Sequence, residues 1–172
     1  CVDALIACRP GRVVIGTVDP NPLVSGKGID ALRQSGIQTE VGVLEPACRE
    51  INRFFFKFIR TGLPYVTLKF AQTLDGRIAT VTGDARWVSS PASRRFAHRL
   101  RATHDAILVG AGTIRADDPE LTCRLVRGRD PLRIILDSRL RLPSDAKVFA
   151  DGKTTLVAST GRAKADRRHL LE

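Results

Sequence analysis

The sequence predicts an α/β fold, because short apolar runs typical of strands alternate with helical segments. The first 60 residues have the order strand, helix, strand, helix, which implies parallel pairing and layered α/β packing. Two later stretches of five mostly apolar residues, Asp105–Val109 and Leu132–Leu136, have the length and composition of buried strands. The length of 172 residues, 43% of them apolar, excludes wholesale disorder and suits one domain or parts of two.

Glycine and proline residues mark the ends of the elements expected before residue 61. Pro10-Gly11 ends a first helix, Pro20 and Pro22 stiffen a loop, and Gly36 ends a second helix. The third helix carries Ile51, Phe55 and Ile59 on one face. The expected helices are 2–8, 28–34 and 45–59, and the expected strands are 12–17 and 39–44.

A domain boundary is expected at Thr61-Gly62-Leu63-Pro64, since the pattern changes there. Ser90 is a suitable cap for a helix with Pro91 at its first position, running to about Arg101. Asp75-Gly76 predicts a tight turn. The other expected helices are a short turn reaching 117 and a polar helix over 162–172, and the expected strands are 65–72, 105–109, 132–136, 148–150 and 154–157.

Composition narrows the classes of function. No apolar run approaches the roughly 18 residues of a spanning helix, and no export signal opens the chain, so we expect a cytoplasmic protein without membrane partners. The net charge of +10 favours anionic partners such as phosphorylated metabolites or dinucleotides. The basic residues are scattered and not interleaved with aromatic ones, so we do not expect a nucleic-acid partner.

Three motifs each have a chemical and a structural interpretation. Gly110-Ala111-Gly112-Thr113 ends a strand and suits a phosphate, but the third glycine of the dinucleotide fingerprint is missing, so a plain turn is the alternative. Asp117-Asp118-Pro119 can pair carboxylates for metal or acid–base work, or begin a turn. Trp87 either packs in a core or stacks on a nicotinamide or pyrimidine ring.

The cysteines do not form a recognisable metal or disulfide pattern. No pair has CxxC spacing, and the three histidines do not cluster with them, so a complete zinc site is not expected. Cys8, Cys48 and Cys123 are interpreted as buried or incidental thiols.

Several segments, taken in order, resemble the bifunctional riboflavin-biosynthesis deaminase/reductase family of bacteria, the RibD/RibG type, over about residues 1–138. The segments that carry the resemblance are Cys1–Ile6, Asp19–Pro22 with Gly26–Gly28, Thr61–Lys69, Leu74–Ala79, Gly83–Ser90, Val109–Thr113 and Ala116–Arg124.

The resemblance implies an α/β chain made of two partial domains. Residues 1–60 would be the back half of a cytidine-deaminase-like zinc domain, and residues 64–172 the front part of a dihydrofolate-reductase-like NADPH-dependent domain. Cys1 matches the second zinc-binding cysteine of the family. The His-x-Glu segment and the first cysteine have no match here, so we expect no deaminase catalytic residue and no deamination by this chain.

The resemblance also implies that the reductase half reduces the ribosyl chain of a phosphorylated pyrimidine with NADPH. Family contacts with the cofactor fall on Ala71, Trp87, Thr113, Asp117 and, more weakly, Ser138. Contacts with the substrate fall on Ala85, Arg101, Leu121 and Arg124. Ala85 stands where the family often has Ser, so a hydroxyl contact is lost there. Lys69 and Asp75 are weaker candidates near the site.

The missing methionine and the opening Cys1 fit a piece of a longer chain, and we expect this piece alone to bind NADPH poorly and not to turn over. The family's reductases commonly pair, so a homo-oligomer is expected by analogy. Two alternatives stay open: a stand-alone pyrimidine or pterin reductase, and a basic nucleic-acid-binding module, which a salt-dependent shift with duplex would favour.

Overall fold

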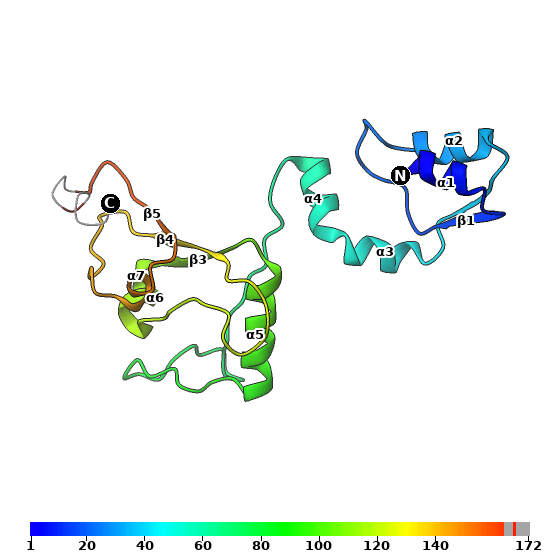
Figure 1. Cartoon of the computed structure of the whole chain (residues 1–172). Coiled ribbons are helices and arrows are strands. Elements are labelled where there is room, and N and C mark those ends of the chain that lie inside the picture. The colour runs from blue at the N-terminus through cyan, green and yellow to red at the C-terminus, as the bar shows by residue number, and fades with distance from the viewer. Residues whose placement is uncertain (164–166, 168–172) are drawn as a thin grey trace. The chain divides into compact units, whose positions relative to one another are not determined.

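The computed structural model describes residues 1–163 and Arg167, and its chain divides into two compact units, Cys1–Leu68 and Lys69–Glu172 (Figure 1). Within the described part of the chain, no helix is long and apolar enough to cross a membrane.

The first unit is built on a two-stranded parallel sheet. Strand β1 (Arg12–Ile15) pairs with β2 (Gln38–Val41), as the alternation of elements predicts. Helices α1 (Val2–Cys8) and α2 (Lys27–Gln34) contact each other, and Leu32 and Ile37 are buried. Arg9, in the left-handed conformation, ends α1 just before Pro10, so the expected stop is confirmed.

The helix expected over 45–59 is wrong in two respects. It is divided into α3 (Glu45–Ile51) and α4 (Arg53–Thr61) at Asn52, whose side-chain amide donates to the carbonyl of Cys48 at 2.8 Å. Such a side-chain bond competes with the helical backbone pattern. The buried aromatic residue of α4 is Phe56, whereas Ile51 is 76% exposed.

The second unit is built on a three-stranded parallel sheet in the order β3-β4-β5 (Figure 1). Its strands are β3 (Ala106–Gly110), β4 (Leu132–Leu136) and β5 (Thr155–Ala158), and its helices are α5 (Pro91–Thr103), α6 (Ala111–Asp117) and α7 (Lys147–Ala150). Ser90 caps α5 by accepting the Ser93 N–H at 3.2 Å, which confirms the predicted start. The core of this unit comprises Ile114, Leu121, Ile135, Leu142, Ala146 and Val148.

Two strand predictions between residues 65 and 150 are wrong. The segment 65–72 forms no β-strand, and its alternate residues Val66, Leu68 and Phe70 are 61–82% exposed. A strand needs a neighbour for its backbone groups, which the local pattern does not reveal. The run 148–150 belongs instead to α7, because Asp118 accepts the Lys147 N–H at 2.9 Å and Val148 is fully buried. The polar helix expected over 162–172 lies mostly outside the described residues.

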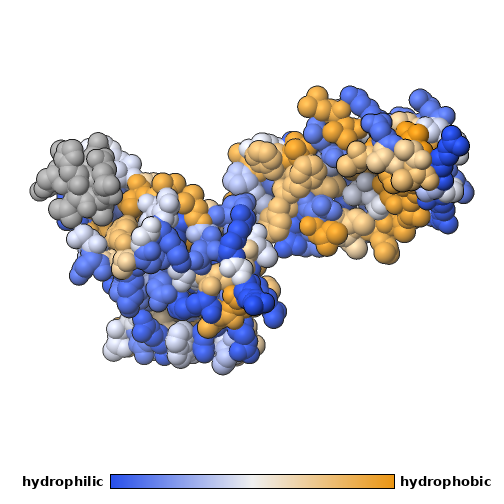
Figure 2. Space-filling view, viewed as in Figure 1, coloured by the Kyte–Doolittle hydropathy of each residue, from blue (hydrophilic) through white to orange (hydrophobic). Residues whose placement is uncertain are grey.

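Apolar side chains remain at the surface of both units (Figure 2). In the sheet of the second unit, one residue of each strand is about half exposed: Leu108, Leu136 and Leu156. The opposite face carries Ile107, Val109 and Ile135, which pack in the core. The sheet therefore buries one face within the described part of the unit.

A buried ion pair joins β4 to the turn before β5. The Arg133 side chain is 2% exposed and bonds Asp151 through both terminal nitrogens, at 3.0 and 2.8 Å, and the Lys153 carbonyl at 2.7 Å. The hydrogen bonds from Arg133 are the main cause that lowers the Asp151 pKa to about 2. Because the pKa is lowered by folding, the stabilisation is complete above about pH 4 and is lost as the pH falls towards 2.

We expect Asp151→Asn to lower the free energy of unfolding by about 2 kcal/mol at pH 7. The figure is below that of a fully buried pair because the Asp151 side chain is 32% exposed. Urea unfolding checks it, with Asp145→Asn as the control, since Asp145 is exposed and bonds to no described residue. The gap between wild type and Asp151→Asn should shrink as the pH falls from 5 to 3; a constant gap would contradict the role of the ion pair.

Candidate functional site

A cavity of about 520 Å³ opens at the carboxyl ends of β3 and β4. The strand register places Gly110 opposite Leu136, so both strands end at the same edge of the sheet. Ligands of open parallel sheets bind at this edge. The residues that line the cavity are Ala111, Gly112, Leu136, Asp137, Ser138, Arg139, Arg141 and Arg162.

One buried carboxylate shapes the wall of this cavity. Asp137 is 4% exposed, and its side chain accepts the backbone N–H groups of Arg139, Arg141 and Leu142 at 3.3, 2.5 and 2.9 Å. These bonds hold the residues after β4 in a tight loop. Leu140 and Leu142 are buried, whereas the arginines that alternate with them are exposed. The alternation directs apolar side chains to the core and guanidinium groups to solvent beside the cavity.

Three guanidinium groups in the cavity wall form no ion pair with any described residue. Among the described residues, no carboxylate lies within ion-pair distance of Arg139, Arg141 or Arg162. Arginine binds phosphate through paired N–H donors. A Cβ at Gly112 would meet no atom within 4 Å, so a ligand can approach the backbone there. This donor set fits an anionic phosphate group.

The residues predicted to contact the cofactor lie partly around this cavity. Ser138 lines it directly. Thr113 and Asp117 are exposed one turn apart on α6, which begins at the cavity wall. Ala71 is half-buried in the irregular segment before the turn at Gly76, and no hydrogen bond from its backbone to a described residue connects it to the cavity.

Trp87 is 70% exposed, so it is not a core residue. The Arg94 guanidinium lies 4.1 Å from its ring centroid, and Arg94 also donates to the Ser89 carbonyl at 2.9 Å. The neighbouring Arg86 donates to the Asp117 carbonyl at 3.3 Å. These contacts hold the loop 83–90 against α5 and α6 and leave an exposed aromatic ring at the site.

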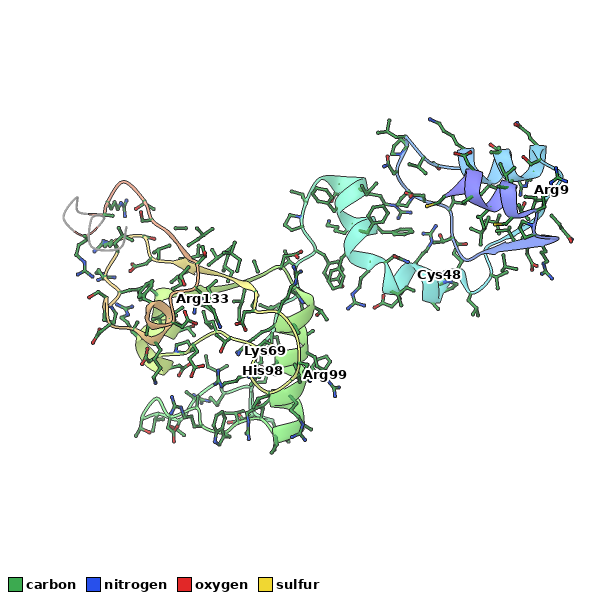
Figure 3. All side chains as sticks on the ribbon, in the orientation of Figure 1. Arg9, Cys48, Lys69, His98, Arg99 and Arg133 are labelled. Atoms are coloured by element: carbon green, nitrogen blue, oxygen red, sulfur yellow. The ribbon has the colours of Figure 1, made fainter. Side chains whose placement is uncertain are left out.

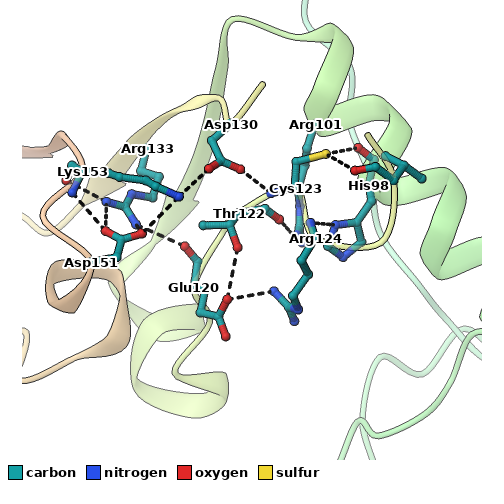
Figure 4. A network of polar contacts seen from close by, with 11 residues as sticks. His98, Arg101, Glu120, Thr122, Cys123, Arg124, Asp130, Arg133, Asp151 and Lys153 are labelled. Carbon is teal, nitrogen blue, oxygen red and sulfur yellow. Dashed lines mark hydrogen bonds and ion pairs between the residues drawn. The ribbon is translucent and has the colours of Figure 1, made fainter. Parts of the chain in front are cut away.

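Three of the four residues predicted to contact the substrate lie on α5 or on the segment 120–124, and Figure 4 labels two of them, Arg101 and Arg124. Arg101 donates to the Thr122 carbonyl at 2.9 Å, and His98 accepts the Arg124 N–H at 3.1 Å. Leu121 is 3% exposed with a φ of 58°, so only its backbone can reach a substrate. Ala85 is half-buried in the loop 83–90, which also carries Trp87, and this loop precedes α5 in the sequence.

The electrostatics of this segment favour anions. Burial is the main cause that lowers the Arg101 pKa, and the charge of Arg124 adds to it. The Arg124 side chain is 52% exposed and its guanidinium lies 3.6 Å from Glu120. Two neighbouring guanidinium groups, of which that of Arg124 is half exposed, form a suitable site for a phosphate.

A polar network continues from this segment to the sheet (Figure 4). Asp130 accepts the Cys123 N–H at 2.6 Å and pairs with Lys153, also at 2.6 Å. These two partners, the backbone N–H first, lower the Asp130 pKa. Lys153 then lies 3.7 Å from Asp151, the partner of Arg133. The backbone beside the predicted substrate residues is thus tied to β4 and β5.

Asp118 has a structural role. It ends α6 with a φ of 39°, and its side chain accepts the backbone N–H of Lys147, which is the main cause that lowers its pKa. The turn interpretation of Asp117-Asp118-Pro119 is therefore the one that the structure supports for Asp118.

The weaker candidates remain outside the bonded networks. Asp75 accepts a hydrogen bond from Thr73 at 2.5 Å in the predicted tight turn, where Gly76 has a φ of 80°. Lys69 is exposed in the irregular segment 65–72, and Figure 3 labels it.

The described residues do not form a zinc site. Cys1 is an exposed free thiol, and no group of three His, Cys, Asp or Glu side chains within residues 1–163 and Arg167 could hold a metal. Cys8 is exposed as well, whereas Cys48 and Cys123 are half-buried. The residues present therefore do not fit a bound zinc ion.

The three arginines of the cavity and His98 were not among the predicted site residues. A signal for the arginines was present in Ser138-Arg139-Leu140-Arg141-Leu142, which alternates polar and apolar residues directly after a strand. His98 had no such signal, since its neighbour Arg124 is 26 positions away.

Known proteins of one family match most of this chain. The sequence model of the RibD C-terminal domain matches residues 64–172. Riboflavin biosynthesis protein RibD of Aquifex aeolicus is 47% identical over 97% of this chain and 48% of the relative, and that of Bacillus amyloliquefaciens is 49% identical over 88% and 41%. The chain spans about half the length of the curated relatives that it matches.

Solved structures give the same result. A diaminohydroxyphosphoribosylaminopyrimidine deaminase/5-amino-6-(5-phosphoribosylamino)uracil reductase from Thermotoga maritima matches with a TM-score of 0.86 and 41% identity, over 95% of this chain and 47% of that one. RibD of Acinetobacter baumannii matches with a TM-score of 0.83 and 37% identity, over 99% of this chain and 49% of that one. The resemblance inferred from sequence motifs is confirmed: the chain belongs to the RibD C-terminal domain family, and its mixed α/β fold resembles that of a RibD reductase domain.

Proposed function

We propose that residues 64–172 are the front part of an NADPH-dependent reductase that acts on a phosphorylated pyrimidine in riboflavin biosynthesis. The reaction is reduction of the ribosyl chain of 5-amino-6-(5-phosphoribosylamino)uracil to a ribityl chain. The observation that carries the proposal is the cavity beside Gly112, whose three arginines have no described counter-charge, in a chain of this family.

The cofactor phosphates belong, in this proposal, to the cavity at the ends of β3 and β4. Arg139, Arg141 and Arg162 would bind the phosphate that carries the highest charge, and Ser138 would donate its hydroxyl. Thr113 and Asp117 would contact the cofactor from the exposed side of α6. When bound, NADPH supplies the hydride.

The nicotinamide end of the cofactor would lie near Trp87. Its ring is exposed and has one guanidinium, that of Arg94, against it. An aromatic face at this place would orient a second ring by stacking. Ala71, close in sequence to the turn at Gly76, remains part of the proposed cofactor surface.

The substrate phosphate would be bound by Arg101 and Arg124. Arg124 has the more exposed guanidinium, whereas Arg101 also holds the Thr122 carbonyl. Leu121 would contribute its backbone and Ala85 only van der Waals contact. The two guanidinium groups would orient the anionic end of the substrate so that its ribosyl carbon can face the hydride donor.

Residues 1–60 are, in the same proposal, the back half of a cytidine-deaminase-like domain. The parallel strands β1 and β2 with helices α1 and α2 are compatible with it. Cys1 would be one zinc ligand of that domain, although the described residues do not complete a site, and we assign no deaminase chemistry to them. We retain a cytoplasmic homo-oligomer without a nucleic-acid partner as the expected setting.

The experiment that tests the function measures NADPH oxidation at 340 nm by the intact protein that carries this sequence, with 5-amino-6-(5-phosphoribosylamino)uracil as substrate. We expect oxidation that depends on both compounds. Oxidation that does not depend on the pyrimidine, or none with a folded protein, would contradict the proposal.

Arg141→Gln should raise the KM for NADPH by about ten- to a hundredfold, because a charge-assisted bond to phosphate is lost. The preference for NADPH over NADH should narrow, since NADH lacks the extra phosphate. Arg95→Gln, on the exposed part of α5 and outside the cavity, is the matched control and should leave both values within about twofold. An equal loss in the two variants would disprove the assignment of the cavity.

Arg101→Ala should raise the KM for the pyrimidine by about tenfold or more and leave the KM for NADPH nearly unchanged. Steady-state kinetics with each compound varied in turn measures the two constants separately. The assignment of Arg101 to the substrate site is wrong if the KM for the pyrimidine and kcat both stay at the wild-type level.

A further inference from the structure

His98 lies at the contact between α5 and the segment that carries the proposed substrate residues. Its side chain is among the buried polar groups, with the residue 5% exposed, and its Nδ1 atom accepts the backbone N–H of Arg124 at 3.1 Å (Figure 4). One turn further along the helix, Arg101 holds the Thr122 carbonyl. The Cys123 thiol donates to the His98 carbonyl at 3.5 Å. Three consecutive residues, 122–124, are therefore fixed to one face of α5.

The direction of the bond defines the protonation of the imidazole. A backbone N–H can only donate, so Nδ1 of His98 must carry no proton, and the neutral ring has its proton on Nε2. His104 shows the opposite arrangement, because its Nδ1 lies 2.7 Å from the Leu100 carbonyl, which can only accept. Nδ1 is thus a hydrogen-bond acceptor in His98 and a donor in His104.

The surroundings of His98 keep it neutral near pH 7. Burial is the main cause that lowers its pKa from the ordinary 6.5, and the charges of Arg101 and Arg124 lower it further. Glu120 is the group that raises it. The thiol of Cys123 bonds to the His98 backbone and not to its ring. A proton on Nδ1 would both remove the acceptor and place a cation beside two guanidinium groups.

We propose that His98 is a positioning residue for substrate binding: its unprotonated Nδ1 holds the backbone of Arg124, and protonation of the ring in mild acid releases it. The inference rests on the proposed function, which places Arg124 at the substrate phosphate. It adds a regulation of that site by pH, exerted by a residue that does not itself touch the substrate.

Two variants separate the loss of the hydrogen-bond acceptor of His98 from the loss of its ring. His98→Asn places a carbonyl oxygen close to the position of Nδ1 and cannot be protonated, whereas His98→Leu has no acceptor. At pH 8 the Leu variant should show a KM for the pyrimidine raised about three- to tenfold with kcat within about twofold. The Asn variant should retain the wild-type KM within about twofold. Equal KM values for Leu and wild type would overturn the proposal.

The pH profile tests the release of the segment. The substrate phosphate also titrates near pH 6, but it does so equally for every variant. The KM of the wild type should therefore rise more steeply between pH 8 and pH 5.5 than that of His98→Asn. Superimposable profiles of these two proteins would overturn the pH-dependent role.

A measurement on the 172-residue chain is independent of any reductase activity. Nitrogen-15 NMR should show His98 as the Nε2–H tautomer at pH 7.5, titrating below pH 6.5, with the Arg124 amide signal shifting at the same midpoint. His98 with its proton on Nδ1, or a midpoint at 6.5 or above, would overturn the proposal even if the enzyme is active. The expected NMR signals, together with no reductase activity in the folded intact protein that carries this sequence, would instead overturn the proposed function and the substrate role of Arg124.

Discussion

The buried carboxylate of Asp137 is the constraint on which the candidate cofactor site depends. It ends β4 and accepts three backbone N–H groups of the loop that follows. Without such an acceptor, the N–H of Leu142 would be buried and unpaired, at a cost of about 1–3 kcal/mol. The loop that results buries Leu140 and Leu142 and leaves the intervening arginines at the cavity. A single acidic residue thus anchors a basic surface in a chain with a net charge of +10.

The same principle applies at the other end of the unit, where charged groups hold backbone and not only each other. Arg133 bonds the carbonyl of Lys153, Asp130 accepts the N–H of Cys123, and Arg101 donates to Thr122. These contacts fix the irregular segment 120–130, which has no ladder of its own, against α5 and the sheet. The proposed substrate residues therefore lie on a loop that is held by side chains from regular elements, a common arrangement for binding sites.

The sequence predicts best where the information is local. The start of α5 follows from Ser90 and Pro91, and the five residues of β4 were predicted with their observed bounds. It fails where distant residues decide. The run 148–150 has the composition of a strand but belongs to α7, whose first N–H bonds to the distant Asp118. Asn52 divides the helix expected over 45–59. The family resemblance predicted site residues near the strand ends and on α5. His98 could not be predicted in this way, because its contact with Arg124 spans 26 positions of the sequence.

The most direct test is a crystal structure of the intact protein that carries this sequence, with NADP⁺ bound. We expect a phosphate group of the cofactor within about 3 Å of a guanidinium nitrogen of Arg139, Arg141 or Arg162, and the Asp137 bonds unchanged. A fully ordered cofactor whose phosphates all lie away from these arginines would contradict the assignment of this cavity and, with it, the orientation proposed for the reductase site.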